Sequence, residues 1–156
     1  MLSRLIVLSF ALSFSIFAQS SQLEFPYVPN DKMTPGEFCT RQNPDYLGDA
    51  YPEKIAKCER DVVYVTKQKV YDMYGVKQSC RVNYTIDHFI PLSLGGDNSI
   101  ENLWPEHKSV KALRQNLELN LFQDLRDAKL SQAEAVRQIR QAKLNPPIKK
   151  PMVLCH

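Results

Sequence analysis

The side chains best suited to chemistry lie close together in the second half of the chain. Asp87 and His88 are adjacent, and Asn102 and His107 follow them. Hydrolysis of a phosphodiester needs a base that activates water and positive charge beside the phosphate. An imidazole can be that base, and a carboxylate can hold a cation that supplies the charge. An isolated Asp-His pair, however, fits a capped turn next to a buried ring better than a catalytic site.

These residues stand in a pattern that predicts strand, loop, strand and helix. An alternating run, Tyr84–His88, is followed by a loop with two glycines at 95 and 96, where we expect positive φ. A second apolar run begins at Asn102. Neighbouring side chains in a strand point to opposite faces. Asp87 and His88 can therefore serve one site only at a strand end, where twist and turn bring both toward it.

Two strings within this stretch carry a family resemblance. Asp-His-x-x-Pro-Leu-x-Leu-Gly-Gly begins at Asp87, and Asn-Leu-Trp-Pro-Glu begins at Asn102. Together they resemble the HNH branch of the ββα-metal (His-Me finger) endonucleases, and in particular its small exported bacterial members. Thr-Pro-Gly at 34–36 and Lys-x-x-Val-Tyr-x-x-Tyr-Gly at 67–75 extend the resemblance upstream. It implies an α+β fold whose ββα-metal core, over 82–128, packs a short hairpin on a helix, with further helices around it.

The resemblance also implies residue roles. The position of Asp87 binds one divalent metal ion, that of His88 is the general base, and that of Asn102 bridges the loop and orients the imidazole. The chain departs from the family at its third position, a metal ligand on the helix. The family spacing, counted from Asn102, places Lys111 at this position, and a lysine cannot ligate a metal while protonated.

His107 is the nearest substitute for the missing ligand, at the expected start of the helix; a contact to phosphate or solvent is the alternative, and Asn116 is a more distant candidate. The hard oxygen of Asp87 favours Mg²⁺. An added imidazole would favour Mn²⁺, Zn²⁺ or another transition ion. Trp104 is expected to anchor the core rather than to stack on a base.

Three basic residues at the start of the predicted helix, Lys108, Lys111 and Arg114, could contact phosphates, although a solvated charged face explains them equally well. The chain has 20 Lys and Arg against 17 Asp and Glu. This mild positive excess is compatible with a polyanionic partner but does not argue for one.

The remaining segments surround this motif. Residues 21–52, rich in Pro, Asn, Asp and Gly, predict an irregular arm, and 52–58 a short helical turn. A helix is expected over 66–74 and another over 108–129. Ser131 and Glu134 form a capping box that opens a last helix, ending near Lys143 within the C-terminal part 131–156.

The first twenty residues predict a signal peptide. Arg4 gives a basic start, an apolar run extends from Leu5 to Phe17, and cleavage is expected after Ser20, with Ala18 as the near alternative. The run is shorter than the roughly 20 apolar residues of a membrane helix, so an uncleaved anchor is the less favoured interpretation. We expect an exported protein, periplasmic or extracellular, with no membrane association after cleavage.

All four cysteines follow that segment, at Cys39, Cys58, Cys80 and Cys155. An even count in an oxidising compartment favours disulfides over free buried thiols. Cys39–Cys58 is the preferred pair because these residues bracket one irregular, proline-containing segment. Cys80–Cys155 then follows by elimination.

The sequence thus predicts one exported domain, 21–156, that hydrolyses phosphodiester bonds of nucleic acid with a divalent metal. DNA is favoured over RNA as the substrate. Low sequence specificity is expected, because nothing in the chain resembles a base-reading module. A monomer is favoured. The alternatives are an RNase and a disulfide-stabilised nucleic-acid-binding protein that keeps the scaffold without catalysis.

Overall fold

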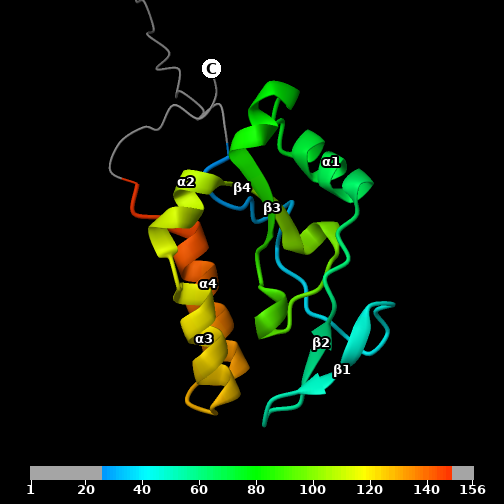
Figure 1. Ribbon diagram of the computed structural model, residues 1–156, viewed down its shortest axis with the longest axis vertical. Helices are drawn as coiled ribbons and strands as arrows, with labels where there is room; N and C mark the ends of the chain where they lie inside the picture. Colours follow the sequence, from blue (N-terminus) through cyan, green and yellow to red (C-terminus); the bar gives the residue numbers. More distant parts are fainter. Residues whose placement is uncertain (1–25, 149–156) are drawn as a thin grey trace, which may run out of the picture.

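The computed structural model describes residues 26–148, and their architecture is α+β (Figure 1). The predicted signal peptide and Cys155 lie outside these residues. In chain order the regular elements are β1 (Tyr46–Ala50), β2 (Ile55–Cys58), α1 (Tyr64–Met73), β3 (Tyr84–His88), β4 (Leu103–His107), α2 (Lys108–Lys111), α3 (Leu117–Arg126) and α4 (Gln132–Leu144). Short 3-10 turns precede β3 and β4, follow β3 and separate α2 from α3. The strands form two antiparallel pairs, β1–β2 and β3–β4.

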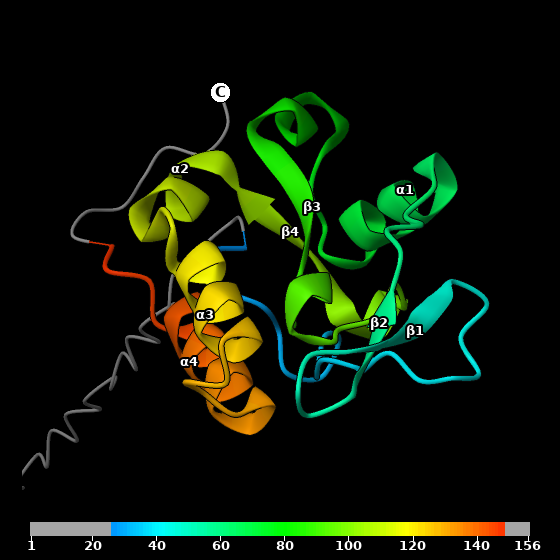
Figure 2. The same cartoon turned by 60° about the horizontal axis from the view of Figure 1, so that its bottom comes forward.

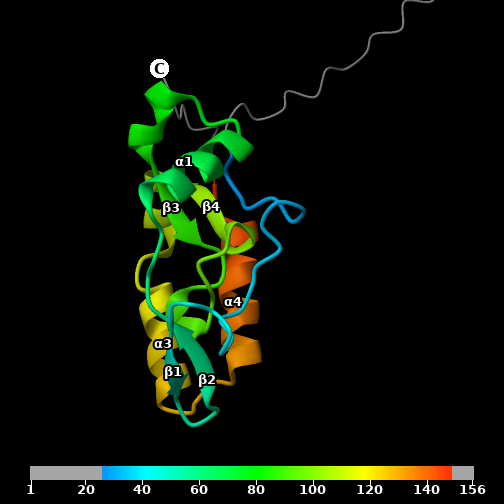
Figure 3. The same cartoon turned by 90° about the vertical axis from the view of Figure 1, so that its right-hand side faces the viewer.

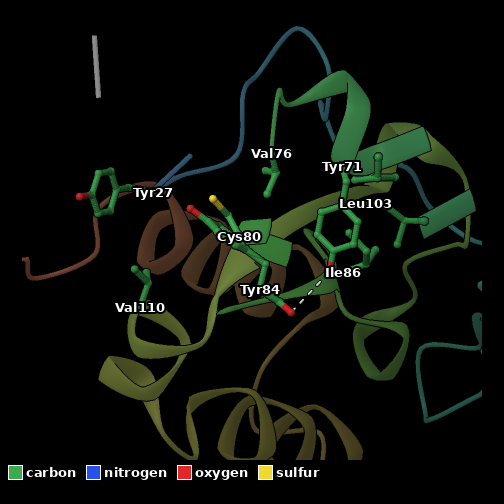
Figure 4. Packing of buried hydrophobic residues seen from close by; sticks show 9 residues of the cluster. Tyr27, Tyr71, Val76, Cys80, Tyr84, Ile86, Leu103 and Val110 are labelled. Atoms are coloured by element: carbon green, nitrogen blue, oxygen red, sulfur yellow. Dashed lines mark hydrogen bonds between the residues drawn. The ribbon is translucent and has the colours of Figure 1, made fainter. Parts of the chain in front are cut away.

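The β3–β4 hairpin is central, between α1 on one side and α2, α3 and α4 on the other (Figures 1 and 2). Its register pairs Tyr84 with His107 at one end and His88 with Leu103 at the other. Because directly paired residues share a face, one face carries Tyr84, Ile86 and Leu103. These three pack into a core with α1, where Tyr71 Oη donates to the carbonyl of Tyr84 at 3.4 Å (Figure 4).

A second core lies between α3 and α4, which run side by side in both views (Figures 1 and 2). Leu121 and Leu125 of α3 pack there with Val136 and Ile139 of α4. The side chain of Ser131 accepts a hydrogen bond from the Glu134 N–H at 3.2 Å. The predicted N-terminal cap of this helix is confirmed.

The predicted continuous helix over 108–129 is wrong. It breaks after a 3-10 turn: Gln115 leaves the helical conformation, with ψ of 138°, and Asn116 is left-handed, with φ of 66°. The reason is that its apolar residues serve two cores. Val110 packs with the hairpin, Leu121 packs against α4, and Leu113 between them is exposed. The break redirects the chain from one core to the other, and Asn tolerates the left-handed conformation that it needs.

The predicted helical turn at 52–58 and the fully irregular arm over 21–52 are also wrong. Strands β1 and β2 form a hairpin at the lower end of the molecule (Figure 3). Ile55 and Cys58 are buried because the core and a disulfide hold them.

The predicted Cys39–Cys58 bridge is confirmed, with Cα atoms 5.8 Å apart. Cys80 is fully buried, and its pairing with Cys155 stays a prediction. No helix within residues 26–148 has the length and apolarity to cross a membrane.

Candidate active site

Asp87, near the end of β3, faces a cluster of cationic side chains. Its Oδ1 lies 2.5 Å from Lys111 Nζ and its Oδ2 lies 2.6 Å from Lys143 Nζ, while Arg114 Nη2 is 3.8 Å from Oδ2. Burial alone would raise the pKa of Asp87, but the ammonium groups of Lys143 and Lys111 outweigh it and hold that pKa well below its usual value. Asp87 is therefore a buried carboxylate that stays ionised.

Glu106 on β4 is the second carboxylate of this cluster and shares the face of the hairpin that carries Asp87. It is fully buried and pairs through Oε1 with Arg114. Among the residues that the structure describes, its Oε2 accepts no hydrogen bond, and Lys111 Nζ lies 3.9 Å away. Burial, together with the charge of Asp87, raises the pKa of Glu106 to about 7. Three cationic groups thus face two carboxylates.

His88, the last residue of β3, is buried with both ring nitrogens engaged. Its Nδ1 lies 3.2 Å from Arg60 Nη1, and its Nε2 lies 2.9 Å from Asn98 Oδ1. Burial is the main reason that its pKa is lowered, and the Arg60 guanidinium adds to the effect, while the hydrogen bond to Asn98 opposes it. The imidazole is therefore neutral at neutral pH, as a general base must be.

The partners of His88 also fix which nitrogen carries the proton. A guanidinium can only donate, so Nδ1 must accept from Arg60 and the proton must lie on Nε2, which donates to Asn98 Oδ1. The amide of Asn98 is itself oriented, because its Nδ2 donates to the Asp45 carboxylate and to the carbonyl of Glu59. The basic lone pair of His88 is thus at Nδ1.

Asn102 has one of its two predicted roles: it bridges the loop but does not contact the imidazole. Its amide bridges the loop: Oδ1 accepts from Ile90 N at 2.8 Å, and Nδ2 donates to the carbonyls of Ile90 and Asp97. It does not accept from the imidazole, however, because those three backbone groups satisfy its side chain and Asn98 is placed against the ring instead.

The two loop glycines serve different needs. Gly95 has a φ of 89°, as expected, but Gly96 does not have positive φ. A Cβ at Gly96 would lie 1.9 Å from the carbonyl oxygen of Ile90 and 2.8 Å from Asn102 Nδ2. Gly96 is therefore required by the close approach that lets the Asn102 amide bridge the loop.

The structure does not bring His107 to Asp87, so the predicted shared metal site is not assembled. His107 pairs with Tyr84 at the opposite end of the hairpin and points to the opposite face. Its Nδ1 lies 2.6 Å from Ser109 Oγ, and its ring meets that of Tyr84 edge-on, with centroids 5.0 Å apart. Asn116, the more distant candidate, forms the left-handed break before α3.

A groove of about 660 Å³ lies beside the cationic cluster, lined by Lys108, Lys111, Arg114 and Lys143 among others. A smaller hollow of about 400 Å³ is lined by Lys57 and Arg60. Ser93 and Phe122 line both, so the two adjoin.

Of the three predicted phosphate contacts, Lys108 donates to the carbonyl of Val82, and Lys111 and Arg114 pair with carboxylates. Trp104 is fully buried and packs in the interior as predicted.

Four residues of this site were not predicted: Arg60, Asn98, Glu106 and Lys143. For two of them the sequence contains a pattern that indicates a buried position. Lys143 continues the stripe of Val136 and Ile139 on the apolar face of α4, where a lysine needs a buried partner. Glu106 alternates with Trp104, so a longer second strand places it on the face of Asp87. Arg60 and Asn98 lie in loops, and no periodicity indicates them.

The donor atoms near Asp87 test whether a divalent cation suits this site. Within residues 26–148, no group of three or more His, Cys, Asp and Glu side chains is placed to hold a metal ion. The donors in the cluster are carboxylate oxygens. Mg²⁺ is commonly bound by one or two carboxylates, with water and substrate phosphate completing its shell. The donor set therefore fits Mg²⁺ better than an ion that prefers imidazole.

Comparisons of the chain with protein-family models, with curated proteins and with solved structures found no match. The geometry of His88 and Asp87 is accordingly the basis for a functional interpretation.

Proposed function

We propose that this protein is an exported, metal-dependent endonuclease with an HNH-type ββα-metal site, which hydrolyses phosphodiester bonds of nucleic acid. The observation that carries the proposal is the fixed tautomer of His88. Its imidazole is buried and neutral, has its lone pair at Nδ1, and directly follows an ionised carboxylate within a cationic cluster.

His88 acts as the general base in this proposal. Nδ1 takes a proton from water as the water oxygen attacks phosphorus, and the bond from phosphorus to the 3′ oxygen breaks. Arg60 occupies Nδ1 in the free protein, at 3.2 Å. A substrate phosphate offers this guanidinium a charge-assisted partner, so substrate binding would release Nδ1 to water and place Arg60 against the phosphate.

Asp87 would hold the divalent cation, which supplies positive charge beside the scissile phosphate and assists departure of the 3′ oxygen. The adjoining hollows give the substrate a path, with Lys108, Lys111 and Arg114 along one part and Lys57 along the other. Contacts of this kind bind the phosphate backbone without reading sequence. They support low sequence specificity, and DNA remains the favoured substrate.

The test is cleavage of supercoiled plasmid, single-stranded DNA and RNA by the purified protein, first with EDTA and then with Mg²⁺, Mn²⁺, Ca²⁺ or Zn²⁺. Metal-dependent nicking of plasmid, strongest with Mg²⁺ or Mn²⁺, is expected. Cleavage of RNA alone would identify an RNase. Retention of all three nucleic acids on the protein without cleavage under any metal would refute the nuclease and favour a binding protein on the same scaffold.

A further inference from the structure

Lys111 holds the position that a cation would take between two carboxylates. Its Nζ lies 2.5 Å from Asp87 Oδ1 and 3.9 Å from Glu106 Oε2. That Glu106 oxygen belongs to a fully buried side chain and accepts no hydrogen bond from any residue that the structure describes. A buried carboxylate oxygen normally has a donor, so its orientation toward the ammonium group is informative.

Lys111 also differs from the other two cations of the cluster in exposure. Its side chain is 47% exposed, whereas those of Arg114 and Lys143 are 11% and 1% exposed. Without Lys111, two buried cationic groups would remain to balance two carboxylates. Lys111 is therefore the surplus charge of the cluster, and it can swing out into the adjoining groove.

We propose that Asp87 and Glu106 together form the divalent-cation site, and that Lys111 is a tethered cation which closes this site until it is drawn away. The proposal rests on the nuclease function proposed above, and it adds a second ligand, Glu106, and a control on metal binding. A substrate phosphate in the groove would attract the Lys111 ammonium and so open Asp87 Oδ1 and Glu106 Oε2 to the metal.

The decisive experiment measures metal binding in the absence of nucleic acid, by calorimetric titration with Mn²⁺ and Mg²⁺. Lys111→Met removes the competing charge and should tighten binding by about tenfold or more, because two like charges only a few ångströms apart repel strongly at a buried site. Lys108→Met, on the same short helix and lining the same groove, removes an equal charge that does not contact Asp87. It should leave the affinity nearly unchanged.

Glu106 is tested in the Lys111→Met background. Adding Glu106→Gln, which keeps an oxygen for Arg114, should abolish the gain in metal affinity. A second measurement does not depend on that variant folding: Mn²⁺ added to Lys111→Met should broaden the amide NMR signals of Asp87 and Glu106 before that of His107.

The proposal is overturned if Lys111→Met binds either metal no more tightly than the parent protein. It is overturned equally if Mn²⁺ broadens the signal of His107 first, or if the double variant binds as well as Lys111→Met. Since no step uses nucleic acid, these outcomes are independent of the cleavage assay. A protein that binds metal as described but cuts nothing would refute the nuclease function alone.

Discussion

Lys143 Nζ lies 2.6 Å from Asp87 Oδ2 and 2.5 Å from the carbonyl oxygen of His88, so the last turns of α4 are tied to the end of β3. The lysine side chain is almost fully buried. The carboxylate and the base that the sequence places side by side are thus held by a residue from the far end of the described chain. Lys143 orders the site and offsets the charge of Asp87.

Replacing Lys143 by Met should destabilise the protein by roughly 3–5 kcal/mol, because it leaves the Asp87 carboxylate buried with less compensation. Urea denaturation would measure the loss. Lys129→Met is the matched control, since that lysine is 65% exposed and its ion pairs should contribute about 0–1 kcal/mol. The double variant Asp87→Asn, Lys143→Met should recover part of the loss. A loss for Lys143→Met no greater than for Lys129→Met would contradict this account.

Replacing His88 by Ala should lower the rate of plasmid cleavage by roughly 10²–10⁴-fold, the usual contribution of a general base. The fold should survive, because the hairpin register and the Lys143 contact involve the backbone of this residue. His107→Ala is the control with the same change of side chain. Circular dichroism would verify folding of both variants. Near-normal turnover by folded His88→Ala would remove His88 from the mechanism.

Asn98 should act on cleavage through the imidazole. Its hydrogen bond raises the pKa of His88 against the larger lowering by burial. In the parent protein the acid limb of kcat/KM should therefore lie below the ordinary His pKa of about 6.5. Asn98→Ala removes the opposing contribution, so this limb should move to still lower pH.

Loss of ring orientation in Asn98→Ala should also reduce kcat/KM between about 10-fold and 100-fold. Imidazole ¹⁵N NMR gives an independent measurement: the proton should stay on Nε2 in both proteins, because Arg60 still donates to Nδ1, but the Nε2 signal of the variant should shift through loss of its acceptor. An unchanged pH profile together with an unchanged Nε2 signal would show that Asn98 does not position the base.

The contrast between Asn102 and Asn98 shows what the sequence can predict about this site. Strand alternation and the spacing of the motif were enough to predict the β3–β4 hairpin and the position of Asp87 and His88 at its end. Which asparagine meets the ring depends on how the loop between the strands folds. Close approach at Gly96 lets the Asn102 amide bridge the loop, whereas contacts to Asp45 and Glu59 hold Asn98 against the ring, and single-residue propensity reports neither.

The contacts made by α4 and the break at Asn116 have a related explanation. A 3.6-residue period predicts which residues are apolar on one face, but not which core they join. Leu113 and Leu121 fit one continuous helix, yet only Leu121 is buried. Lys143 contacts a residue 56 positions earlier, and such a pairing is set by tertiary packing. Local patterns therefore predicted helix α4 but not its contribution to the site.

The Cys39–Cys58 bridge should stabilise the β1–β2 hairpin and, through it, the loop that carries Arg60. Replacing both cysteines by Ala should lower the free energy of unfolding by about 2–5 kcal/mol, measured by urea denaturation under non-reducing conditions. Peptide mapping of the non-reduced parent should find Cys39 joined to Cys58 and Cys80 joined to Cys155. A Cys39–Cys80 link would contradict both pairings.

Metal and nucleic acid should bind cooperatively if Lys111 leaves Asp87 for a substrate phosphate. The test uses the His88→Ala variant, so that a bound oligonucleotide is not cut. Saturating oligonucleotide should tighten Mn²⁺ binding by roughly 5-fold to 150-fold, the usual range of coupling between two sites. By linkage, Mn²⁺ must tighten oligonucleotide binding by the same factor, which fluorescence anisotropy would measure.

Adding Lys111→Met to this variant should largely remove the coupling, because the metal site is then open whether or not a phosphate is present. Adding Lys108→Met instead should weaken oligonucleotide binding through loss of a charge in the groove, but leave the coupling factor intact. Equal coupling in the two double variants would show that nucleic acid favours metal binding by another route, for example through a phosphate oxygen that ligates the ion directly.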